Sequence, residues 1–335
     1  MVEHRIATLG SHSALQILKG ARDEGIKNIC ICTKDREKPY RMFDVADEII
    51  TIPRYSDYLS VEEHLLKKNA IIIPHASFIE YVGIPNVMKM KVPYYGNKKI
   101  LEWESDREKQ TQWLRKAGLK MPKIFTDPKE IDRPCIVKFH GAKGGKGYFI
   151  TNSLMDFKRK MAVHPQQKFT IQEYIVGVPM YIHYFYSPIT KELEIMSFDK
   201  RYESNVDSIG RISARDQNSF EDVDPSYVVV GNVPVVLRES LLPKVIEMGE
   251  NVIKESQRMI PGGLWGPFCL ETVISPDQEF HTFEISARIV AGTNPFINGS
   301  PYSYLKYSKP MSTGRRIALE IKRAEEQKQL DIVLG

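Results

Sequence analysis

The first 95 residues alternate short apolar segments with amphipathic segments, and this alternation constrains the fold more than any other feature of the chain. Residues 5–10, 28–33, 47–52 and 70–73 are predicted to be buried strands, with helical patterns such as 14–21 between them. Strands that alternate with helices are typical of a parallel sheet. We therefore predict an N-terminal parallel α/β domain at residues 1–97.

Two segments that each contain His and Ser follow the first and fourth predicted strands. They are Gly-Ser-His-Ser at 10–13 and Pro-His-Ala-Ser at 74–77. In parallel sheets, ligands bind outside the carboxyl ends of the strands, so both segments should lie at one binding edge. The first segment also opens a helix, whose free N–H groups suit a phosphate together with the hydroxyls of Ser11 and Ser13. Two simpler interpretations stay open, a serine that only caps the helix and a histidine with a structural role.

Residues 268–288 are predicted to form a β-hairpin that carries two glutamates. Two alternating segments flank a Ser-Pro-Asp-Gln turn. If Ile274 pairs with Glu279, then Glu271 and Glu284 share one face as diagonal neighbours, with their Cβ atoms about 7–8 Å apart or less. The opposite face then carries four core side chains, Phe268, Leu270, Phe283 and Ile285. A register slip of one residue would separate the two carboxylates.

Two adjacent carboxylates repel each other unless a cation lies between them. Mg²⁺ prefers hard oxygen ligands, and one or two carboxylates commonly hold it together with substrate phosphates. We therefore predict that Glu271 and Glu284 bind a divalent cation. The alternative is two unrelated acids on a solvated face.

A glycine-rich segment, His-Gly-Ala-Lys-Gly-Gly-Lys-Gly at 140–147, connects two predicted strands. It is neither a Walker A loop nor a dinucleotide-binding turn, because both of those precede a helix. Glycines let backbone N–H groups approach phosphate oxygens, and lysines offset the phosphate charge. We expect a phosphate-binding flap, with a plain hairpin loop as the alternative. Lys138, in the preceding strand, needs an anionic partner or a ligand because a buried unpaired ammonium group is costly.

The composition excludes several classes of protein. With 335 residues, 42% hydrophobic and 27% charged, the chain has an ordinary globular composition. Its net charge of +5 is spread evenly, so no basic arm suggests nucleic acid, and no apolar segment is long enough for a membrane. The four cysteines lack metal-binding spacing, and no signal-peptide pattern is present, so we expect a cytoplasmic protein. Arg315 and Arg316, in the first turn of a C-terminal helix, suggest a nearby anion.

The order of these parts resembles the ATP-grasp superfamily of ATP-dependent carboxylate–amine ligases. The shared parts are a small α/β domain, a lysine-bearing strand at 136–138, a Gly-rich flap, a Gln-Glu-Tyr-Ile hinge at 172–175, and two glutamates thirteen residues apart, the second in Glu-Ile-x-x-Arg. The resemblance spans about residues 1–330. It implies an ATP-grasp domain of α+β character at 98–335, with a lid at about 115–180.

The same resemblance implies roles for individual residues. ATP phosphates would be contacted by Lys138, by Lys99 or its neighbour Lys98, and by the flap residues Lys143, Gly144, Gly145 and Gly147. Adenine would be held at Glu173, Tyr174 and Ile175. Pro179 stands where the superfamily usually has an acid for ribose, so Glu203 or no acid at all would take that role. Glu271 and Glu284 would bind Mg²⁺ or Mn²⁺, and Arg288 would be the catalytic residue that faces the transferring group.

Residues 8–15, 73–78 and 283–294 resemble a narrower family, the archaeal formate-dependent synthetases of purine biosynthesis. Most ATP-grasp enzymes have a metal-binding asparagine where this chain has Ser286, and in the narrower family serine is expected there. That family formylates 5-aminoimidazole-4-carboxamide ribonucleotide (AICAR) to the formamido product (FAICAR) with ATP and formate, through formyl phosphate.

This narrower resemblance implies a homo-oligomer, either a trimer or a hexamer. The ribonucleotide would be held by Ser11, His12, Ser13, Ser77, Asn232 and Asn294. Two other functions stay open at this point. One is an ATP-grasp ligase for another carboxylate or amine, and the other is a nucleotide-binding sensor of the same fold without catalysis.

Overall fold

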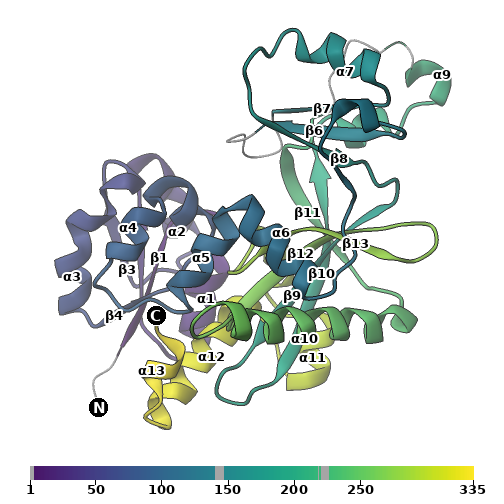
Figure 1. Cartoon of the computed structure of the whole chain (residues 1–335). Coiled ribbons are helices and arrows are strands. Elements are labelled where there is room, and N and C mark those ends of the chain that lie inside the picture. The colour runs from purple at the N-terminus through teal and green to yellow at the C-terminus, as the bar shows by residue number, and fades with distance from the viewer. Residues whose placement is uncertain (1–3, 140–146, 218, 220–225) are drawn as a thin grey trace.

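The computed structural model describes residues 4–139, 147–217, 219 and 226–335. These residues form three sheets, each built from its own part of the chain (Figure 1). The first has the strand order β3-β2-β1-β4, the second β11-β10-β9-β12-β13, and the third β5-β8-β6-β7.

The first sheet is parallel throughout and buries a continuous apolar core. Its strands are β1 (Arg5–Leu9), β2 (Asn28–Cys32), β3 (Glu48–Thr51) and β4 (Ala70–Ile72). Its helices and helical turns are α1 (Ala14–Asp23), η1 (Lys34–Arg36), α2 (Glu37–Met42), η2 (Tyr55–Val61), α3 (Glu62–Lys67), η3 (Phe78–Val82) and α4 (Ile84–Lys89). All five residues of β2 are buried, as expected for a parallel strand covered on both faces. The predicted parallel α/β arrangement is confirmed.

The end of the chain returns to this first sheet. Helices α12 (Thr313–Glu326) and α13 (Leu330–Val333), yellow in Figure 1, lie beside it, and α12 packs closely on α1. Two glycines make this approach feasible. A Cβ on Gly20 would lie 2.2 Å from the Arg315 backbone nitrogen, and one on Gly314 would lie 2.3 Å from the Gln16 carbonyl oxygen.

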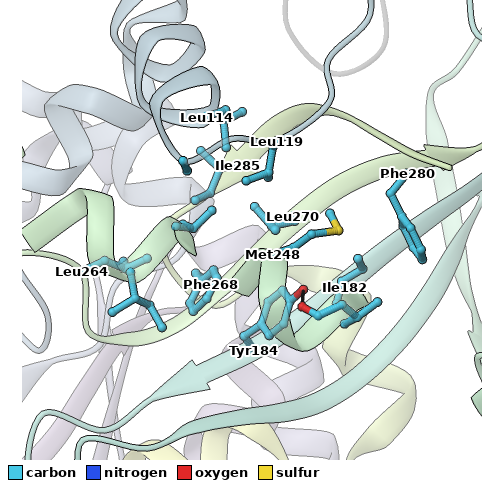
Figure 2. Close-up of a cluster of buried hydrophobic side chains, with 14 of the residues drawn as sticks. Leu114, Leu119, Ile182, Tyr184, Met248, Leu264, Phe268, Leu270, Phe280 and Ile285 are labelled. Carbon is cyan, nitrogen blue, oxygen red and sulfur yellow. Dashed lines mark hydrogen bonds between the residues drawn. The ribbon is translucent and has the colours of Figure 1, made fainter. Parts of the chain in front are cut away.

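The second sheet is antiparallel, and one of its faces is the largest core of the molecule. Its strands are β9 (Val178–Tyr186), β10 (Leu193–Glu203), β11 (Val229–Val235), β12 (Gly266–Ile274) and β13 (Phe280–Ser286). Helices α6 (Arg107–Lys116) and α10 (Leu242–Met259) cover this face, and Figure 2 shows Leu114 and Met248 from these helices packed near Ile182, Leu270 and Ile285 of the strands. Such burial supplies most of the folding free energy of a sheet of this kind.

The third sheet lies apart from the first, at the top of Figure 1. It consists of β5 (Ile124–Phe125), β6 (Cys135–Phe139), β7 (Tyr148–Thr151) and β8 (Phe169–Glu173), with α7 (Leu154–Met161) packed on its own small core. The remaining elements are α5 (Lys98–Ser105), η4 (Pro128–Glu130), α8 (Val206–Ile209), α9 (Ala214–Gln217), η6 (Glu239–Leu241), η7 (Ala291–Phe296) and α11 (Pro301–Tyr307).

The predicted fold class, a parallel α/β unit followed by α+β structure, is therefore confirmed. Within the described ranges, none of the helices combines the length and the apolar character that crossing a membrane requires.

Candidate active site

The second sheet has a polar face, opposite its core face, and this polar face carries the charged side chains of the site. Residues opposite each other in a strand pair point to the same face. Tyr181 of β9 lies opposite both Asp199 of β10 and Glu271 of β12, and Glu271 lies opposite Glu284 of β13. Arg201 lies two residues beyond Asp199 and so shares this face.

The register of the hairpin differs from the prediction, and a β-bulge restores the pairing of the glutamates. Ile274 lies opposite Phe280 and not Glu279, because the Glu279 carbonyl belongs to the turn and accepts a backbone hydrogen bond of 3.0 Å there. This slip alone would put the two glutamates on opposite faces. A register shift next to Glu271 adds one residue to β13, which brings Glu271 directly opposite Glu284.

The bulge also explains why the prediction for Phe283 was wrong. The other three predicted core side chains of the hairpin are buried in the main core. Phe283 is only half-buried and packs edge-on against Tyr181, with 6.5 Å between ring centroids. Its ring lies 5.5 Å from the ammonium group of Lys138, so it forms an aromatic wall beside the glutamates.

The two glutamates have different surroundings. Glu271 is buried and accepts hydrogen bonds from Arg201 Nη2 (2.8 Å) and Ser286 Oγ (3.3 Å). Glu284 reaches solvent, yet protein atoms surround its carboxyl group. Loss of hydration, followed by the negative charge of Glu271, raises the Glu284 pKa from 4.5 to about 7, while Arg201 and Lys138 oppose this shift. Among the described residues, the positive charges of Arg201 and Lys138 do not outweigh these effects, so the ionised form of Glu284 is disfavoured.

This arrangement fits a divalent cation. Two carboxylates directly opposite each other on paired strands offer hard oxygen ligands, and the raised Glu284 pKa indicates a place where a cation would be stabilised. In the described part of the chain, no group of three or more His, Cys, Asp or Glu side chains is placed to hold a metal ion. Ser286 donates to Glu271, so phosphate or water oxygens would have to complete the coordination.

Lys138 is the cation that the third sheet contributes near the glutamate pair. Burial lowers its pKa, the carboxylates of Glu284 and Glu271 act in the opposite direction, and the positive charge of Arg107 lowers it further. The strand that carries Lys138 pairs antiparallel with β7, so the predicted flap does connect two strands. Gly147 closes the flap with a φ of 74°, a conformation that favours glycine. Three predicted flap residues, Lys143, Gly144 and Gly145, lie outside the described residues.

The predicted adenine hinge lies where the third sheet leads into the second sheet. Glu173 ends β8, and its carboxylate accepts the Lys123 N–H (3.1 Å) and pairs with Arg133 (3.0 Å). Tyr174 follows, and its hydroxyl lies 3.0 Å from that of Tyr227 at the start of the segment that leads into β11. Ile175 comes next and is partly buried.

Three further predicted ATP contacts are less closely tied to this region. Glu203 ends β10, two residues beyond Arg201, and burial raises its pKa to about 7. Lys98 donates to the Met90 carbonyl at 3.0 Å. Lys99 is exposed on α5, and within the described ranges no contact joins it to the glutamate pair.

The edge of the first sheet brings the two His and Ser segments together, as predicted. The rings of His12 and His75 are stacked, with centroids 5.5 Å apart and planes inclined by 3°. The Ser77 N–H donates to His75 Nδ1 (3.3 Å), and Nε2 of His75 lies 2.9 Å from the Leu9 carbonyl oxygen. Burial lowers the pKa of His75 to about 4, so this histidine is a neutral support for His12.

The interpretation of these serines as simple helix caps is not supported. Ser13 occupies the N-cap position of α1, but its side chain makes no capping hydrogen bond, and its hydroxyl lies 2.9 Å from His12 Nδ1. Ser11 accepts a hydrogen bond from Arg36 at 3.1 Å. His12 has a φ of 56°, in the left-handed region that is unusual for a non-glycine residue. Its solvent-exposed side chain is thus presented by a strained loop.

Arginines connect this edge with the glutamate pair. Loss of hydration lowers the His12 pKa well below its usual value, and the neighbouring His75, Arg288 and Arg201 lower it further. Arg288 also forms an ion pair with the buried Glu104 at 3.0 Å. A β-bridge between His75 and Ile289 joins the two parts of the backbone. The edge that carries His12 and His75 and the glutamate pair therefore belong to one continuous surface.

Asn294 and Asn232, both predicted to bind the ribonucleotide, have hydrogen-bond partners within the protein. The amide group of Asn294 donates to the His12 carbonyl (3.0 Å) and accepts from Gln16 (2.8 Å). The Asn232 amide donates to Asp199 at 2.7 Å, and Asp199 in turn pairs with His183 at 2.7 Å. Both asparagines are therefore held in fixed orientations.

Sequence reasoning missed several residues of this site. Asp199 and Arg201 stand two residues apart on β10, and His183 stands between apolar neighbours on β9, so this period-two spacing could have indicated one polar face. Glu104 and Arg107 carry no such signal, since only the tertiary structure places them beside Arg288 and Lys138.

Comparisons with known proteins agree with this geometry. The family described as "Protein of unknown function (DUF1246)" matches residues 6–125, and the one described as "Domain of unknown function (DUF1297)" matches residues 152–335. A crystal structure of the ADP complex of PurK, an N5-carboxyaminoimidazole ribonucleotide synthetase, superposes with a TM-score of 0.67 at 15% identity, covering 94% of this chain and 75% of that one. The fold is that of the ATP-grasp enzymes, as predicted.

The sequence relatives are much closer. A Pyrococcus abyssi protein named 5-formaminoimidazole-4-carboxamide-1-(beta)-D-ribofuranosyl 5'-monophosphate synthetase is 55% identical over 340 residues, covering 99% of this chain and 98% of the relative. A Pyrococcus horikoshii protein of the same name is 57% identical over 338 residues, covering 98% and 99%. The crystal structure of an IMP biosynthesis protein PurP from Thermococcus kodakaraensis has a TM-score of 0.78 at 29% identity, covering 98% of this chain and 100% of that one. This chain belongs to the family of these synthetases, which confirms the narrower resemblance.

Proposed function

We propose that this protein formylates AICAR to FAICAR with ATP and formate, releasing ADP and phosphate, as an ATP-dependent carbon–nitrogen ligase of purine biosynthesis. The observation that carries this proposal is full-length identity of 55–57% to synthetases of that name. The geometry supports it, because one continuous surface holds a metal-binding pair, a lysine for phosphate and a histidine edge for a ribonucleotide.

ATP would lie between the lid and the polar face. Glu173, Tyr174 and Ile175 would hold adenine, while Lys138 and the flap would contact the phosphates. Glu271 and Glu284 would hold Mg²⁺ or Mn²⁺, which offsets the charge that develops on the phosphates during transfer. Closure of the lid excludes water, which would otherwise hydrolyse an acyl phosphate.

The first step joins formate to the γ-phosphoryl group. A formate oxygen forms a bond to the γ-phosphorus, the bond to the β-γ bridging oxygen breaks, and ADP leaves with that electron pair. Lys138 stabilises the phosphoryl oxygens, and Arg288, held by Glu104, faces the group in transfer. The product is formyl phosphate, which activates formate toward a weakly nucleophilic amine.

The second step transfers the formyl group. The 5-amino nitrogen of AICAR bonds to the formyl carbon, the carbon–oxygen bond to phosphate breaks, and the departing phosphate takes the proton that the nitrogen loses. Because its pKa is low, His12 is uncharged at neutral pH and can accept a hydrogen bond from the ribonucleotide. Ser11, Ser13 and Ser77 would contact the ribonucleotide, with Asn232 and Asn294 as further candidates.

Several wider properties belong to the same proposal. We expect a ribonucleotide-binding unit at 1–97, an ATP-grasp unit at 98–335 and a lid at about 115–180. We also expect a homo-oligomer, either a trimer or a hexamer. The substrates are phosphorylated and charged, which supports a cytoplasmic location.

The test is release of ADP with ATP, Mg²⁺, formate and AICAR, with each component omitted in turn. We expect turnover only when all four are present, with FAICAR as the product. Turnover that needs a different acid or amine would favour another ATP-grasp ligase. Binding of ATP without turnover under any pair of substrates would favour a sensor.

Binding of AICAR at the edge of the first sheet, where His12 and Ser77 lie, is tested separately through Michaelis constants. His12→Ala or Ser77→Ala should raise the KM for AICAR by at least about 10-fold, the value of one lost hydrogen bond of about 1.4 kcal/mol, while the KM for ATP changes little. Equal effects on both substrates would contradict the placement of AICAR at this edge.

A further inference from the structure

Arg201 lies on strand β10 in the polar face, two residues from Asp199 and opposite Asn232 of β11. Its Nη2 atom is 2.8 Å from Glu271, and its guanidinium carbon lies 3.9 Å from the centroid of the Tyr181 ring. The ring holds the guanidinium by a cation–π contact and so limits its freedom. About 27% of the Arg201 side chain stays exposed, compared with 5% for Glu271.

The ion pair of Arg201 depends on the residue that would bind the metal. Within the described residues, Glu271 is the only carboxylate in ion-pair distance of Arg201. A divalent cation at Glu271 would compete for the same oxygens. Arg201 would then face the site without a neutralising partner, and a buried or half-buried cation in that state favours an anionic ligand.

The other two cations of the site, Arg288 and Lys138, are less suited to a small carboxylate. Arg288 pairs with Glu104, which does not belong to the metal-binding pair. Lys138 is a point charge and suits phosphate oxygens, whereas the planar guanidinium of an arginine matches the planar carboxylate of an acid. Arg201 is therefore the cation whose shape and charge best fit a small carboxylate.

The position of Arg201 agrees with the path of the reaction. Its charge acts both on Glu284 in the metal pair and on His12 at the ribonucleotide edge. It also lies opposite Asn232 in the strand register. An acid bound to Arg201 would thus lie between the γ-phosphate that it attacks and the amine that later attacks it.

We propose that Arg201 binds the formate carboxylate, and that metal binding at Glu271 makes its guanidinium available. This inference rests on the proposed function. The guanidinium holds the formate oxygen that does not attack the γ-phosphorus, and it keeps this atom as the formyl oxygen when the amine displaces phosphate. Formate binding therefore follows binding of the metal and nucleotide.

The test uses Arg201→Met and Arg201→Lys in the full chain, with Arg258→Met as the matched control. Arg258 is exposed and pairs with Glu255 (3.4 Å) within helix α10, which covers the core face of the second sheet and not its polar face, so its loss should leave all constants unchanged. Mn²⁺ alone is titrated by electron paramagnetic resonance. Formate binding is followed by line broadening of ¹³C-formate with and without Mg²⁺ and a non-hydrolysable ATP analogue.

We expect opposite effects of Arg201→Met on the two ligands. The KM for formate should rise at least about 30-fold, the value of a charge-assisted hydrogen bond of ~2 kcal/mol, and ¹³C-formate should no longer broaden. Mn²⁺ affinity should stay the same or increase, because Glu271 loses its competitor. Arg201→Lys keeps the charge but not the planar guanidinium, so its KM for formate should lie between those of the wild-type protein and Arg201→Met. This variant provides the test if Arg201→Met does not fold.

Two results would overturn the inference. One is a KM for formate that stays unchanged in Arg201→Met although turnover by the wild-type protein depends on formate. The other is a joint loss of Mn²⁺ and formate binding, which would indicate that Arg201 only organises the glutamates. If the wild-type protein itself shows no formate-dependent turnover, the proposed function fails, and this outcome is seen before any variant is measured.

Discussion

Two clusters in this molecule have the same charged groups and different properties. Each places one arginine next to two glutamates, with a lysine near by. The polar-face cluster consists of Arg201, Glu271, Glu284 and Lys138. The α12 cluster consists of Arg316, Glu194, Glu320 and Lys306.

The α12 cluster is internally satisfied. Arg316 is fully buried and donates to both oxygens of Glu194, at 3.0 to 3.2 Å, and to Glu320 at 2.6 Å. The Tyr307 hydroxyl donates to Glu194 (2.7 Å), and the Ser187 hydroxyl donates to Glu320. Each charge has a fixed partner, so the cluster fastens α12 to the second sheet and offers nothing to a ligand.

The polar-face cluster leaves charge uncompensated. Arg201 contacts one glutamate and Glu284 reaches solvent, while loss of hydration and the charge of Glu271 raise the Glu284 pKa and so disfavour its ionised form. The same residue types are structural where every group is paired and chemically competent where one is not. The predictions below test this difference.

The largest effect should follow loss of the glutamate that reaches solvent. Glu284→Gln keeps the shape of the side chain but removes a metal ligand, so ATP turnover should fall at least about 10³-fold, or ~4 kcal/mol. The measurement is ADP release at saturating Mg²⁺, with circular dichroism to show an intact fold. A fully active variant would remove the metal assignment and, with it, the contrast between the clusters.

Removal of Arg316 should instead affect stability. Arg316→Met leaves Glu194 and Glu320 buried without their cation, and breaking a buried charge cluster costs about 3–5 kcal/mol of unfolding free energy. Urea denaturation measures this loss. The fraction that stays folded should keep the wild-type KM for ATP. A stable variant with an altered KM would show that the α12 cluster also serves the site.

The sequence was sufficient for the parts that depend on local pattern. Alternating strands and helices predicted the parallel sheet, and the rule for strand ends placed His12 beside His75. The bulge next to Glu271 could not be predicted, because alternation of side chains does not fix a register shift of one residue. The two glutamates were predicted as neighbours from a wrong register, and the bulge made them direct partners.

Non-local neighbours explain the other differences. Arg315 and Arg316 suggested a bound anion, but their partners are Glu24 for the first and Glu194 and Glu320 for the second. No local sequence pattern indicated a role for Arg201, because its partner Glu271 is 70 residues away. Sequence patterns identify which residues are charged, whereas the fold decides which charges are paired.

The charge imbalance should also appear in the pH dependence of stability. The folded-state pKa of Glu284, about 7, lies above its usual 4.5, so the folded protein loses stability as the pH rises from about 4.5 through 7. Because Glu284 reaches solvent, screening reduces this loss to about 1 kcal/mol. Glu284→Gln should therefore have a higher Tm than the wild-type protein at pH 8, by about 2 °C, and the same Tm at pH 4.

Magnesium provides the control for this pH effect. Added Mg²⁺ should raise the Tm of the wild-type protein at pH 8, where Glu284 is ionised, and should leave that of Glu284→Gln unchanged. Equal Tm values for the two proteins at both pH values would contradict this prediction. They would mean that the charges of Glu271 and Glu284 are balanced without a metal.

The smallest effect should come from the lysine of the α12 cluster. Lys306 is 39% exposed, lies 2.8 Å from Glu192 and is 4.0 Å from Glu194, whose charge Arg316 already neutralises. Exposed pairs of this kind contribute little, so Lys306→Ala should change the unfolding free energy by about 0.5 kcal/mol or less and leave every KM unchanged. Lys138→Ala, its counterpart, should raise the KM for ATP or lower kcat, because it removes the ammonium group that lies near Glu284 and would contact the phosphates. A loss of more than about 1.5 kcal/mol of unfolding free energy in Lys306→Ala would mean that Arg316 alone does not neutralise its two glutamates. The α12 cluster would then have the same charge imbalance as the polar-face cluster.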